Sequence, residues 1–161
     1  MKVFLALVVA VALVFASLGS LWPHIVAPPQ NAEPAAITEL VGTKVVTKVI
    51  DGDTIIAEGE SIRLLGIDTD ERGYPCYAAA KARLEELVLG KEVELEADAE
   101  NADRYGRYLR YVFVNGTNVN LRMVEEGLAI ARFSPKNTKY KEEILAAEAA
   151  ARQAGIGCKW A

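Results

Sequence analysis

The sequence Ile-Arg-Leu-Leu-Gly-Ile-Asp-Thr-Asp-Glu, residues 62–71, predicts a buried strand that runs directly into a cluster of carboxylates. Its aliphatic side chains favour a strand, and Gly66 indicates a kink or a close backbone approach. Three of the last four residues are acidic: Asp68, Asp70 and Glu71. Such carboxylates repel one another unless a cation or a solvated turn accommodates them. With Arg63 on the strand, the stretch indicates a site for a phosphate and a hard metal ion; the alternative is a solvated acidic turn.

Two further stretches fit the same chemistry. Residues 49–56, Val-Ile-Asp-Gly-Asp-Thr-Ile-Ile, have an Asp-Gly turn between apolar strands, which is typical of a hairpin. Asp53 lies just past its tip, whereas Asp51 is expected to serve mainly the conformation of the turn. Residues 103–107, Asp-Arg-Tyr-Gly-Arg, predict a turn with two arginines that precedes a strand at residues 109–114.

These three stretches, in this order, resemble the motifs of the staphylococcal nuclease (thermonuclease-like) family. The family pattern I-D-G-D-T corresponds to residues 50–54, R-L-L-x-I/V-D-T-P-E to residues 63–71, and D-x-Y-G-R to residues 103–107. A fourth match, V-N-x-x-L/M-V/I-x-x-G-L/W-A, covers residues 119–129. The resemblance extends over residues 45–160, and four motifs in order make it highly specific.

The resemblance implies a calcium site made by the carboxylates of Asp53 and Asp68 and the main-chain carbonyl of Thr69. Two carboxylates and a carbonyl leave coordination positions open for water and substrate, as a catalytic site for a hard cation requires. A turn residue is the structural alternative for Asp53.

The resemblance also implies that Glu71 positions the attacking water, with deprotonation of that water as a further role. Arg63 and Arg107 match the two arginines that hold the scissile phosphate; for Arg107 the alternative is a solvated surface charge. The chemistry asks for the same residue types, because hydroxide approaches an anionic phosphodiester only when a cation and bidentate donors hold its charge.

Three residues are expected to bind substrate: Tyr105, Phe133 and Lys136. Tyr105 matches a tyrosine that touches a phosphate, with packing under the neighbouring strand as the alternative. Phe133 stands where the secreted bacterial thermonucleases place a tyrosine against the nucleotide, so stacking is retained and a hydroxyl contact is lost.

Besides Phe133, two further departures from the family pattern affect the site. Asp70 replaces the usual proline and adds charge next to Glu71; it is either an extra calcium ligand or a residue of an ordinary turn. The segment 72–76 is shorter than the lysine-rich loop of the secreted bacterial thermonucleases.

The chain is acidic overall, so its overall electric field does not attract nucleic acid. Beyond residue 26, 17 basic residues stand against 22 acidic ones, a net charge of −5. Local basic patches must then attract the substrate, and we expect two: Arg104, Arg107 and Arg110, and Lys136, Lys139 and Lys141. This balance favours a catalyst that binds transiently over a tight nucleic-acid binder.

The pattern of apolar residues predicts an α+β, mostly β, fold. Strands are expected at residues 44–50, 54–57, 61–67, 93–97 and 109–114, the last turned by Asn115-Gly116. Helices are expected at residues 77–89, 119–126 and from a Thr138 cap to residue 154. Five short strands with a helix after the third fit a partly open Greek-key barrel, the OB-fold. The resemblance implies the same barrel with three helices.

The chain begins with an apolar leader. Lys2 followed by apolar and small residues makes residues 1–26 either a signal peptide or an N-terminal membrane anchor, which would attach the protein to a membrane through residues 3–26. Residues 27–36 form a proline-rich linker, and the folded domain is assigned to residues 37–161. We therefore expect an exported protein, secreted or anchored on the outer face of the cell membrane.

Cysteine and histidine usage narrows the chemistry. Cys76 and Cys158 are the only cysteines, and in an exported domain they are expected to pair; the alternative is two separate buried thiols. The single histidine, His24, lies in the leader. This excludes Ser-His and Cys-His hydrolase mechanisms and histidine-ligated metal nucleases.

We therefore expect a monomeric, calcium-dependent, exported nuclease that cuts DNA and RNA with little sequence preference. The resemblance implies cleavage of the 5′ P–O bond, which leaves 3′-phosphate ends. A non-catalytic nucleic-acid-binding OB-fold module is the alternative, and a surface-anchored calcium-binding domain is a third. The presence of Asp53, Arg63, Asp68, Glu71 and Arg107 favours the nuclease.

Overall fold

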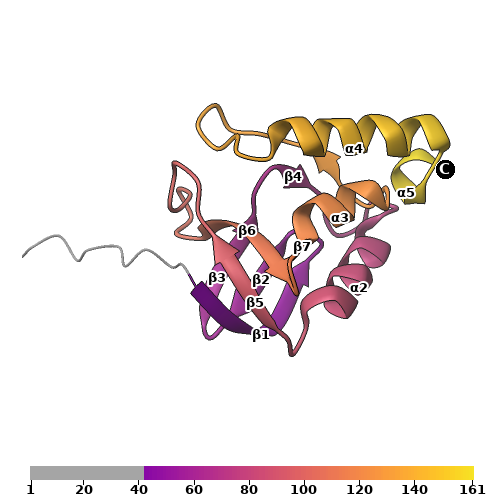
Figure 1. The fold of residues 1–161 in the computed structure, drawn as a ribbon. Helices are drawn as coiled ribbons and strands as arrows, with labels where there is room; N and C mark the ends of the chain where they lie inside the picture. Colours follow the sequence, from indigo (N-terminus) through magenta and orange to yellow (C-terminus); the bar gives the residue numbers. More distant parts are fainter. Residues whose placement is uncertain (1–41) are drawn as a thin grey trace, which may run out of the picture. The chain divides into compact units, whose positions relative to one another are not determined.

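The computed structural model describes residues 42–161, and Figure 1 shows them as a β-barrel with helices on one side. The expected leader (1–26) and linker (27–36), together with the first residues of the expected domain, lie outside the described residues. The boundaries of these three segments therefore stay predictions.

Five strands form the barrel: β1 (Gly42–Asp51), β2 (Thr54–Ala57), β3 (Glu60–Leu64), β5 (Glu92–Glu96) and β6 (Tyr108–Val114). They run in the order β3-β2-β1-β5-β6, and each pairs antiparallel with the next. A parallel pairing of β3 with β6, which sets Ile62 opposite Tyr108, closes the sheet. The α+β fold with a five-stranded OB-type barrel is confirmed, and the barrel is closed rather than partly open.

Three short strands were not predicted. β7 (Thr117–Asn118) extends β6 through a hairpin, and its turn is the expected Asn115-Gly116 pair, with φ of 49° and 76°. β4 (Ile67–Asp68) and β8 (Ile130–Ala131) form a separate two-stranded sheet. The single strand expected at residues 61–67 is therefore broken between β3 and β4.

Gly66 explains this break. Its φ of +77° is a conformation that a residue with a side chain rarely adopts. A Cβ at this position would also lie 2.8 Å from Cε1 of Phe133 and 2.9 Å from Cδ1 of Ile144. Both expectations for Gly66, a kink and a close approach, are met, and together they turn the chain into the carboxylate cluster.

Four helices lie within residues 42–161: α2 (Tyr77–Val88), α3 (Val119–Glu125), α4 (Lys141–Ala154) and the four-residue α5 (Gly157–Trp160). The first three were predicted. The expected cap of α4 at Thr138 is wrong, because that helix begins at Lys141 after Tyr140. Thr138 contributes only its carbonyl, which accepts the N–H of Lys141 at 3.1 Å.

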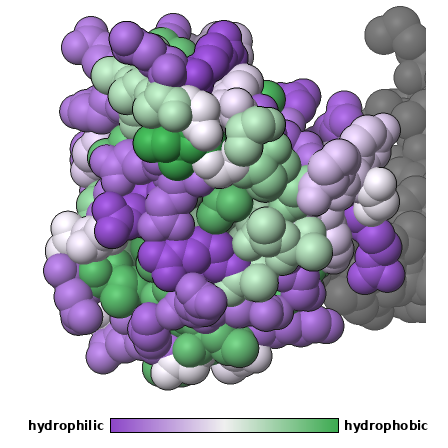
Figure 2. All heavy atoms as spheres, turned by 90° about the vertical axis from the view of Figure 1, so that its right-hand side faces the viewer, coloured by the Kyte–Doolittle hydropathy of each residue, from purple (hydrophilic) through white to green (hydrophobic). Residues whose placement is uncertain are grey.

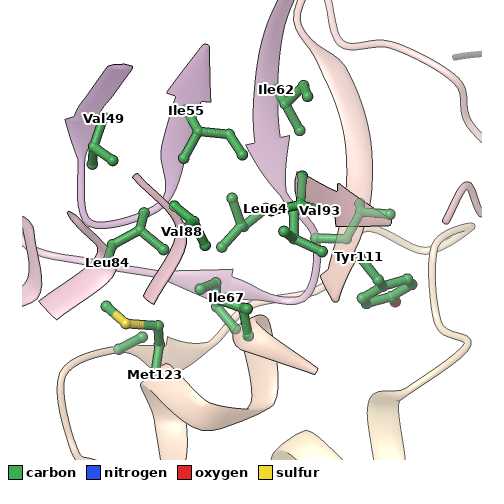
Figure 3. Close-up of a cluster of buried hydrophobic side chains, with 14 of the residues drawn as sticks. Val49, Ile55, Ile62, Leu64, Ile67, Leu84, Val88, Val93, Tyr111 and Met123 are labelled. Carbon is green, nitrogen blue, oxygen red and sulfur yellow. The ribbon is translucent and has the colours of Figure 1, made fainter. Parts of the chain in front are cut away.

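The core lies between the barrel and the helices α2 and α3. Figure 3 shows aliphatic side chains from the strands facing Leu84 and Val88 of α2 and Met123 of α3. Asn120 of α3 is buried among them and fully bonded: its side chain accepts the N–H of Val112 at 3.0 Å and donates to the carbonyl of Leu65 at 2.8 Å. This amide ties α3 to β6 and to the break before β4, and so fixes the strand that leads into the site.

On the side shown in Figure 2, hydrophobic residues form a continuous group right of the centre and smaller groups elsewhere, among hydrophilic residues. Within residues 42–161, no helix is long and apolar enough to cross a membrane.

Candidate active site

Asp53 is held against Thr69 by the tight turn between β1 and β2. A Cβ on Gly52 would lie 2.7 Å from Cβ of Ala80 and 2.8 Å from Oγ1 of Thr69, so glycine permits the approach. Oδ2 of Asp53 accepts the backbone N–H of Thr69 at 2.9 Å and its hydroxyl at 3.1 Å. Asp51 shapes the turn by accepting the N–H of Asp53 at 3.1 Å. The turn thereby places a carboxylate that is only 6% exposed next to the end of β4.

Arg63 joins two carboxylates that come from different segments, Asp53 from the turn before β2 and Asp68 from β4. Its Nη1 lies 2.9 Å from Oδ1 of Asp53, and its Nη2 lies 2.8 Å from Oδ1 of Asp68. Nη1 also donates to the carbonyl of Leu64 at 3.3 Å. One oxygen of each carboxylate therefore converges on the largely buried guanidinium of Arg63.

Burial dominates the electrostatics of Asp53. Burial raises the pKa of this carboxyl to about 6, and the charge of Asp51 adds to the rise. The charge of Arg63 and the hydrogen bonds from Thr69 lower the pKa, but they do not outweigh burial. A buried carboxylate of this kind is stabilised by any additional cation next to it.

The donors present fit a hard cation. Within residues 42–161 no cluster of three or more His, Cys, Asp or Glu side chains is found, so a metal would have two carboxylates, Asp53 and Asp68, and the main chain at Thr69. Oxygen donors of this kind suit Ca²⁺ or Mg²⁺ and not the softer metals. Both carboxylates direct one oxygen to the same guanidinium, that of Arg63, so these oxygens lie close enough together to share a cation.

Arg107 is oriented by Asp103 from the same turn. Its Nε and Nη2 each lie 2.8 Å from Oδ2 of Asp103, whose Oδ1 accepts the backbone N–H of Arg107 at 3.0 Å. The remaining Nη1 lies 3.4 Å from the hydroxyl of Thr54, which in turn donates to Oδ1 of Asp53 at 3.2 Å. Thr54 thus links Arg107 to the carboxylate pair.

A cavity of about 580 Å³ lies beside these residues, and its lining includes Arg63, Arg107, Tyr105, Phe133 and Arg132. Tyr105 is 70% exposed, so it does not pack under a strand. The guanidinium carbons of Arg104 and Arg107 lie 4.8 Å and 5.7 Å from the centre of its ring. The cavity therefore offers arginines for phosphates and aromatic rings for stacking.

The expected basic patches are only partly present. Arg110 is fully buried, with hydrogen bonds from Nη1 to the carbonyls of Asn101 and Leu109, so its place in a surface patch is wrong. Lys136 pairs with Glu100 at 3.1 Å, and Lys139 pairs with Glu96. Glu100 lines the cavity, so the ion pair places Lys136 at the edge of the cavity. The charge of Lys136 is already balanced there by Glu100.

Comparison with known proteins identifies the family. Residues 61–161 match the family model described as Staphylococcal nuclease homologue. The chain belongs to the staphylococcal nuclease family. It is 38% identical over 118 residues to a thermonuclease from Staphylococcus intermedius and 36% identical over 118 residues to one from Staphylococcus hyicus, covering 67% of this chain and 70% of each relative. Endonuclease YncB from Bacillus subtilis is 38% identical over 109 residues, 60% of this chain and 52% of that protein.

Asp70 stands where the pattern of the staphylococcal nuclease family has proline, and both of its carboxylate oxygens have partners within the protein. Its Oδ2 accepts the N–H of Cys76 at 2.9 Å, and its Oδ1 pairs with Nζ of Lys159, which holds the pKa of this carboxyl below its usual range. These two contacts favour the turn over the extra calcium ligand as the role of Asp70. Cys76 and Cys158 form a disulfide with Cα atoms 5.5 Å apart.

Glu71 is the expected site residue that no contact joins to the others. Its side chain is exposed and has no hydrogen bond or ion pair within residues 42–161. Its carbonyl accepts the N–H of Tyr74 at 3.0 Å, which begins a turn. The structure thus brings Asp53, Arg63, Asp68 and Thr69 together directly, adds Arg107 through Thr54, and leaves Glu71 two residues away from Thr69 along the chain.

Sequence reasoning missed Arg132, Asp103 and Thr54. Nη1 of Arg132 lies 2.8 Å from Oδ2 of Asp68 although the two residues are 64 positions apart, and no local pattern signals that contact. Asp103 and Arg107 stand four positions apart within one family motif, and their opposite charges could have indicated the pair.

Proposed function

We propose that this chain is a calcium-dependent nuclease that hydrolyses phosphodiester bonds of DNA and RNA with little sequence preference. The observation that carries the proposal is the convergence of Asp53 and Asp68 on the guanidinium of Arg63, at the edge of a cavity that Arg107 also lines. Relatives named thermonuclease and endonuclease support it.

The carboxylates of Asp53 and Asp68 and the carbonyl of Thr69 would hold the calcium ion. When bound, the ion supplies positive charge that favours ionisation of water and stabilises charge on the phosphoryl oxygens. Calcium fits better than magnesium, because calcium accepts irregular oxygen donors whereas Mg²⁺ demands near-octahedral geometry and loses its waters reluctantly.

The two arginines hold the phosphate. Arg107 is pre-oriented, since Asp103 fixes its Nε and Nη2 and leaves Nη1 directed toward Thr54. Arg63 becomes available once Asp53 and Asp68 no longer neutralise it, and its Nη atoms then face a phosphoryl oxygen as a planar pair of donors. Such donors stabilise the charge that grows on the phosphoryl group in the transition state.

Glu71 accepts the proton of the attacking water. Its carboxylate has no competing partner within the described residues, so it is available as a base and as a hydrogen-bond acceptor for that water. The oxygen of the water forms the new bond to phosphorus while the 5′ P–O bond breaks, and the departing 5′ oxygen takes up a proton from solvent water. The products are a 5′-hydroxyl and a 3′-phosphate.

The lack of sequence preference follows from the kinds of group in the cavity. Arginines bind phosphates, and Tyr105 and Phe133 offer ring faces on which any base can stack. Neither contact reads the edge of a base. With a net negative charge outside the site, the protein would bind its substrate briefly.

Export belongs to the same proposal. The apolar residues that follow Lys2 have the composition of a signal peptide or anchor, and a disulfide between Cys76 and Cys158 persists in an oxidising compartment. Fractionation of expressing cells tests export: activity outside the membrane or on its outer face supports it, and activity in the cytosol contradicts it.

The nuclease proposal is tested by digestion of plasmid DNA and single-stranded RNA with the full chain in calcium, in magnesium and in chelator. We expect both substrates to be degraded in calcium, with much slower degradation in magnesium and none in chelator. The new 3′ ends should block extension by a polymerase until a phosphatase treats them. Binding of either substrate in calcium without cleavage would instead identify a nucleic-acid-binding module.

A further inference from the structure

The C-terminal helix α5 is fixed to the segment that carries Glu71. Nζ of Lys159 pairs with Oδ1 of Asp70, and their side chains are only 16% and 18% exposed. The preceding residue, Cys158, is bonded to Cys76. Two adjacent residues of α5 therefore hold both ends of the segment 70–76.

The segment itself forms a short closed loop. Oδ2 of Asp70 accepts the N–H of Cys76 at 2.9 Å, and within that loop the carbonyl of Glu71 accepts the N–H of Tyr74 at 3.0 Å. One carboxylate oxygen of Asp70 thus closes the loop, and the other anchors the loop to Lys159. The backbone of Glu71 lies inside it.

The helix α5 is a rigid anchor, because it packs on the end of α3 without space for side chains. A Cβ on Gly157 would lie 2.1 Å from the carbonyl oxygen of Glu126, and one on Gly127 would lie 1.8 Å from that of Ile156. The backbone N–H of Lys159 also donates to the carbonyl of Gly127 at 3.0 Å. In Figure 1 this helix lies at the end of α4, close to α3.

We propose that Asp70, Lys159 and the Cys76–Cys158 disulfide are positioning elements for Glu71. The proposal rests on the proposed function, in which Glu71 accepts the proton of the attacking water. The carboxylate of Glu71 has no partner of its own within residues 42–161, so any contact that places this residue acts through its backbone. Where the family pattern has a proline whose ring restricts the backbone, this chain uses the contacts of Asp70.

The metal ligands do not depend on these contacts. Thr69 is held separately, since its N–H and hydroxyl both donate to Asp53. Asp68 is held by Arg63 at 2.8 Å. Loss of the C-terminal anchor should therefore disturb turnover and leave calcium affinity nearly unchanged.

The test uses the full chain with Lys159→Met, which removes the charge and keeps the length of the side chain. We expect kcat in saturating calcium to fall by about 10- to 100-fold, the usual effect of misplacing a reacting group by a fraction of an ångström to an ångström. Calcium Kd by calorimetry and KM should change by less than about threefold. Lys159→Arg, which keeps the ion pair, should retain kcat within about threefold.

Lys44→Met is the control, because it breaks another lysine–carboxylate pair, with Glu58 at 2.8 Å, between β1 and the turn after β2. It should leave kcat unchanged. Two further variants, Asp70→Asn and the double variant Cys76→Ala/Cys158→Ala, each break the same anchor in another way. They keep the test valid if circular dichroism shows that one of the variants folds poorly.

Unchanged kcat in every folded variant of the anchor would overturn the proposal. A fall in calcium affinity that parallels the fall in kcat would overturn it as well, because the anchor would then hold the metal ligands. Absence of calcium-dependent hydrolysis in the unmodified chain is a different result, since it removes the proposed function itself.

Discussion

Nη1 of Arg132 lies 2.8 Å from Oδ2 of Asp68, so that this carboxylate is shared between two arginines. Arg132 follows β8, which pairs with β4 and so brings the two residues together from distant parts of the chain. Its side chain is 70% exposed and lines the same cavity as Arg63 and Arg107. It is therefore free to leave Asp68 for a phosphate at small cost.

Arg132→Ala should have opposite effects on the two ligands. Calcium affinity should rise by about two- to fivefold, because an exposed cation that competes for Asp68 is worth up to about 1 kcal/mol. KM for single-stranded DNA should rise by about three- to tenfold, because one phosphate contact is lost. Calorimetry and steady-state kinetics measure these effects separately. Equal affinity and equal KM would show that Arg132 is an ordinary surface charge.

Calcium affinity should depend on pH through Asp53. Burial raises the pKa of this carboxyl to about 6, so calcium must displace a proton below that pH. The apparent affinity should then fall by about tenfold for each pH unit below about 6, and should be flat between pH 7 and 8. Calorimetry in buffers of different ionisation enthalpy should detect proton release near pH 5.5. Affinity independent of pH between 5 and 7 would contradict this account.

The raised pKa of Asp53 has the opposite effect on the stability of the metal-free protein: stability falls as the pH rises, whereas calcium affinity rises. A carboxyl whose pKa is higher in the folded state binds its proton more tightly there than in the unfolded chain. Its contribution to the free energy of unfolding is therefore complete below about pH 4 and is lost as the pH rises through about 6. Denaturant titrations in chelator should show this loss in the unmodified chain and not in Asp53→Asn.

Arg63→Ala and Arg107→Ala should each lower kcat by about 10³- to 10⁵-fold, because each removes a guanidinium that stabilises phosphoryl charge. Lysine at either position should rescue little, since an ammonium group cannot form the bidentate contact. Arg63→Ala should in addition change calcium affinity, because Asp53 and Asp68 lose their present counter-charge. Rates from quenched-flow or gel assays, with circular dichroism as the control for folding, check these expectations. Near-normal activity in either alanine variant would show that the phosphate is held elsewhere.

The Cys76–Cys158 bond should be present in protein recovered from outside the cell. It closes a separation of 82 residues, for which the chain-entropy model gives about 4–5 kcal/mol. The double variant Cys76→Ala/Cys158→Ala should therefore unfold at a markedly lower denaturant concentration. Peptide mass spectrometry without reductant should find the two cysteines joined. Thiols that alkylate without reductant would refute the bond and weaken the case for export.

Local chemistry made most of the fold predictable. The turn at Asn115-Gly116, the buried stripe Ala80, Leu84 and Val88 of α2, and the break signalled by Gly66 all follow from short-range rules of spacing and conformation. The misplaced cap at Thr138 is the kind of error that such rules make, because a threonine before a helix often caps it and here the chain turns first through Tyr140.

Contacts between distant segments were not predictable in the same way. The family motifs named Asp53 and Asp68, but the meeting of their oxygens on Arg63 depends on the pairing of β2 with β3 and on the turn at Gly66. The sequence indicated an acidic cluster that includes Asp70. Its partner Lys159 lies 89 residues away, and only the folded chain brings the two together. Arg110 read as a surface charge for the same reason, since Asn101 covers it from another segment.

The central claim is that Asp53 and Asp68 make a calcium site that drives phosphodiester hydrolysis. The most direct measurement is the initial rate of cleavage of an end-labelled single-stranded DNA across a calcium titration, for the full chain, for Asp68→Asn, and for the control Glu92→Gln on the exposed face of β5. We predict calcium-dependent cleavage that Glu92→Gln retains and that Asp68→Asn loses at every calcium concentration. Equal cleavage by all three proteins, or cleavage that persists in chelator, would contradict the account.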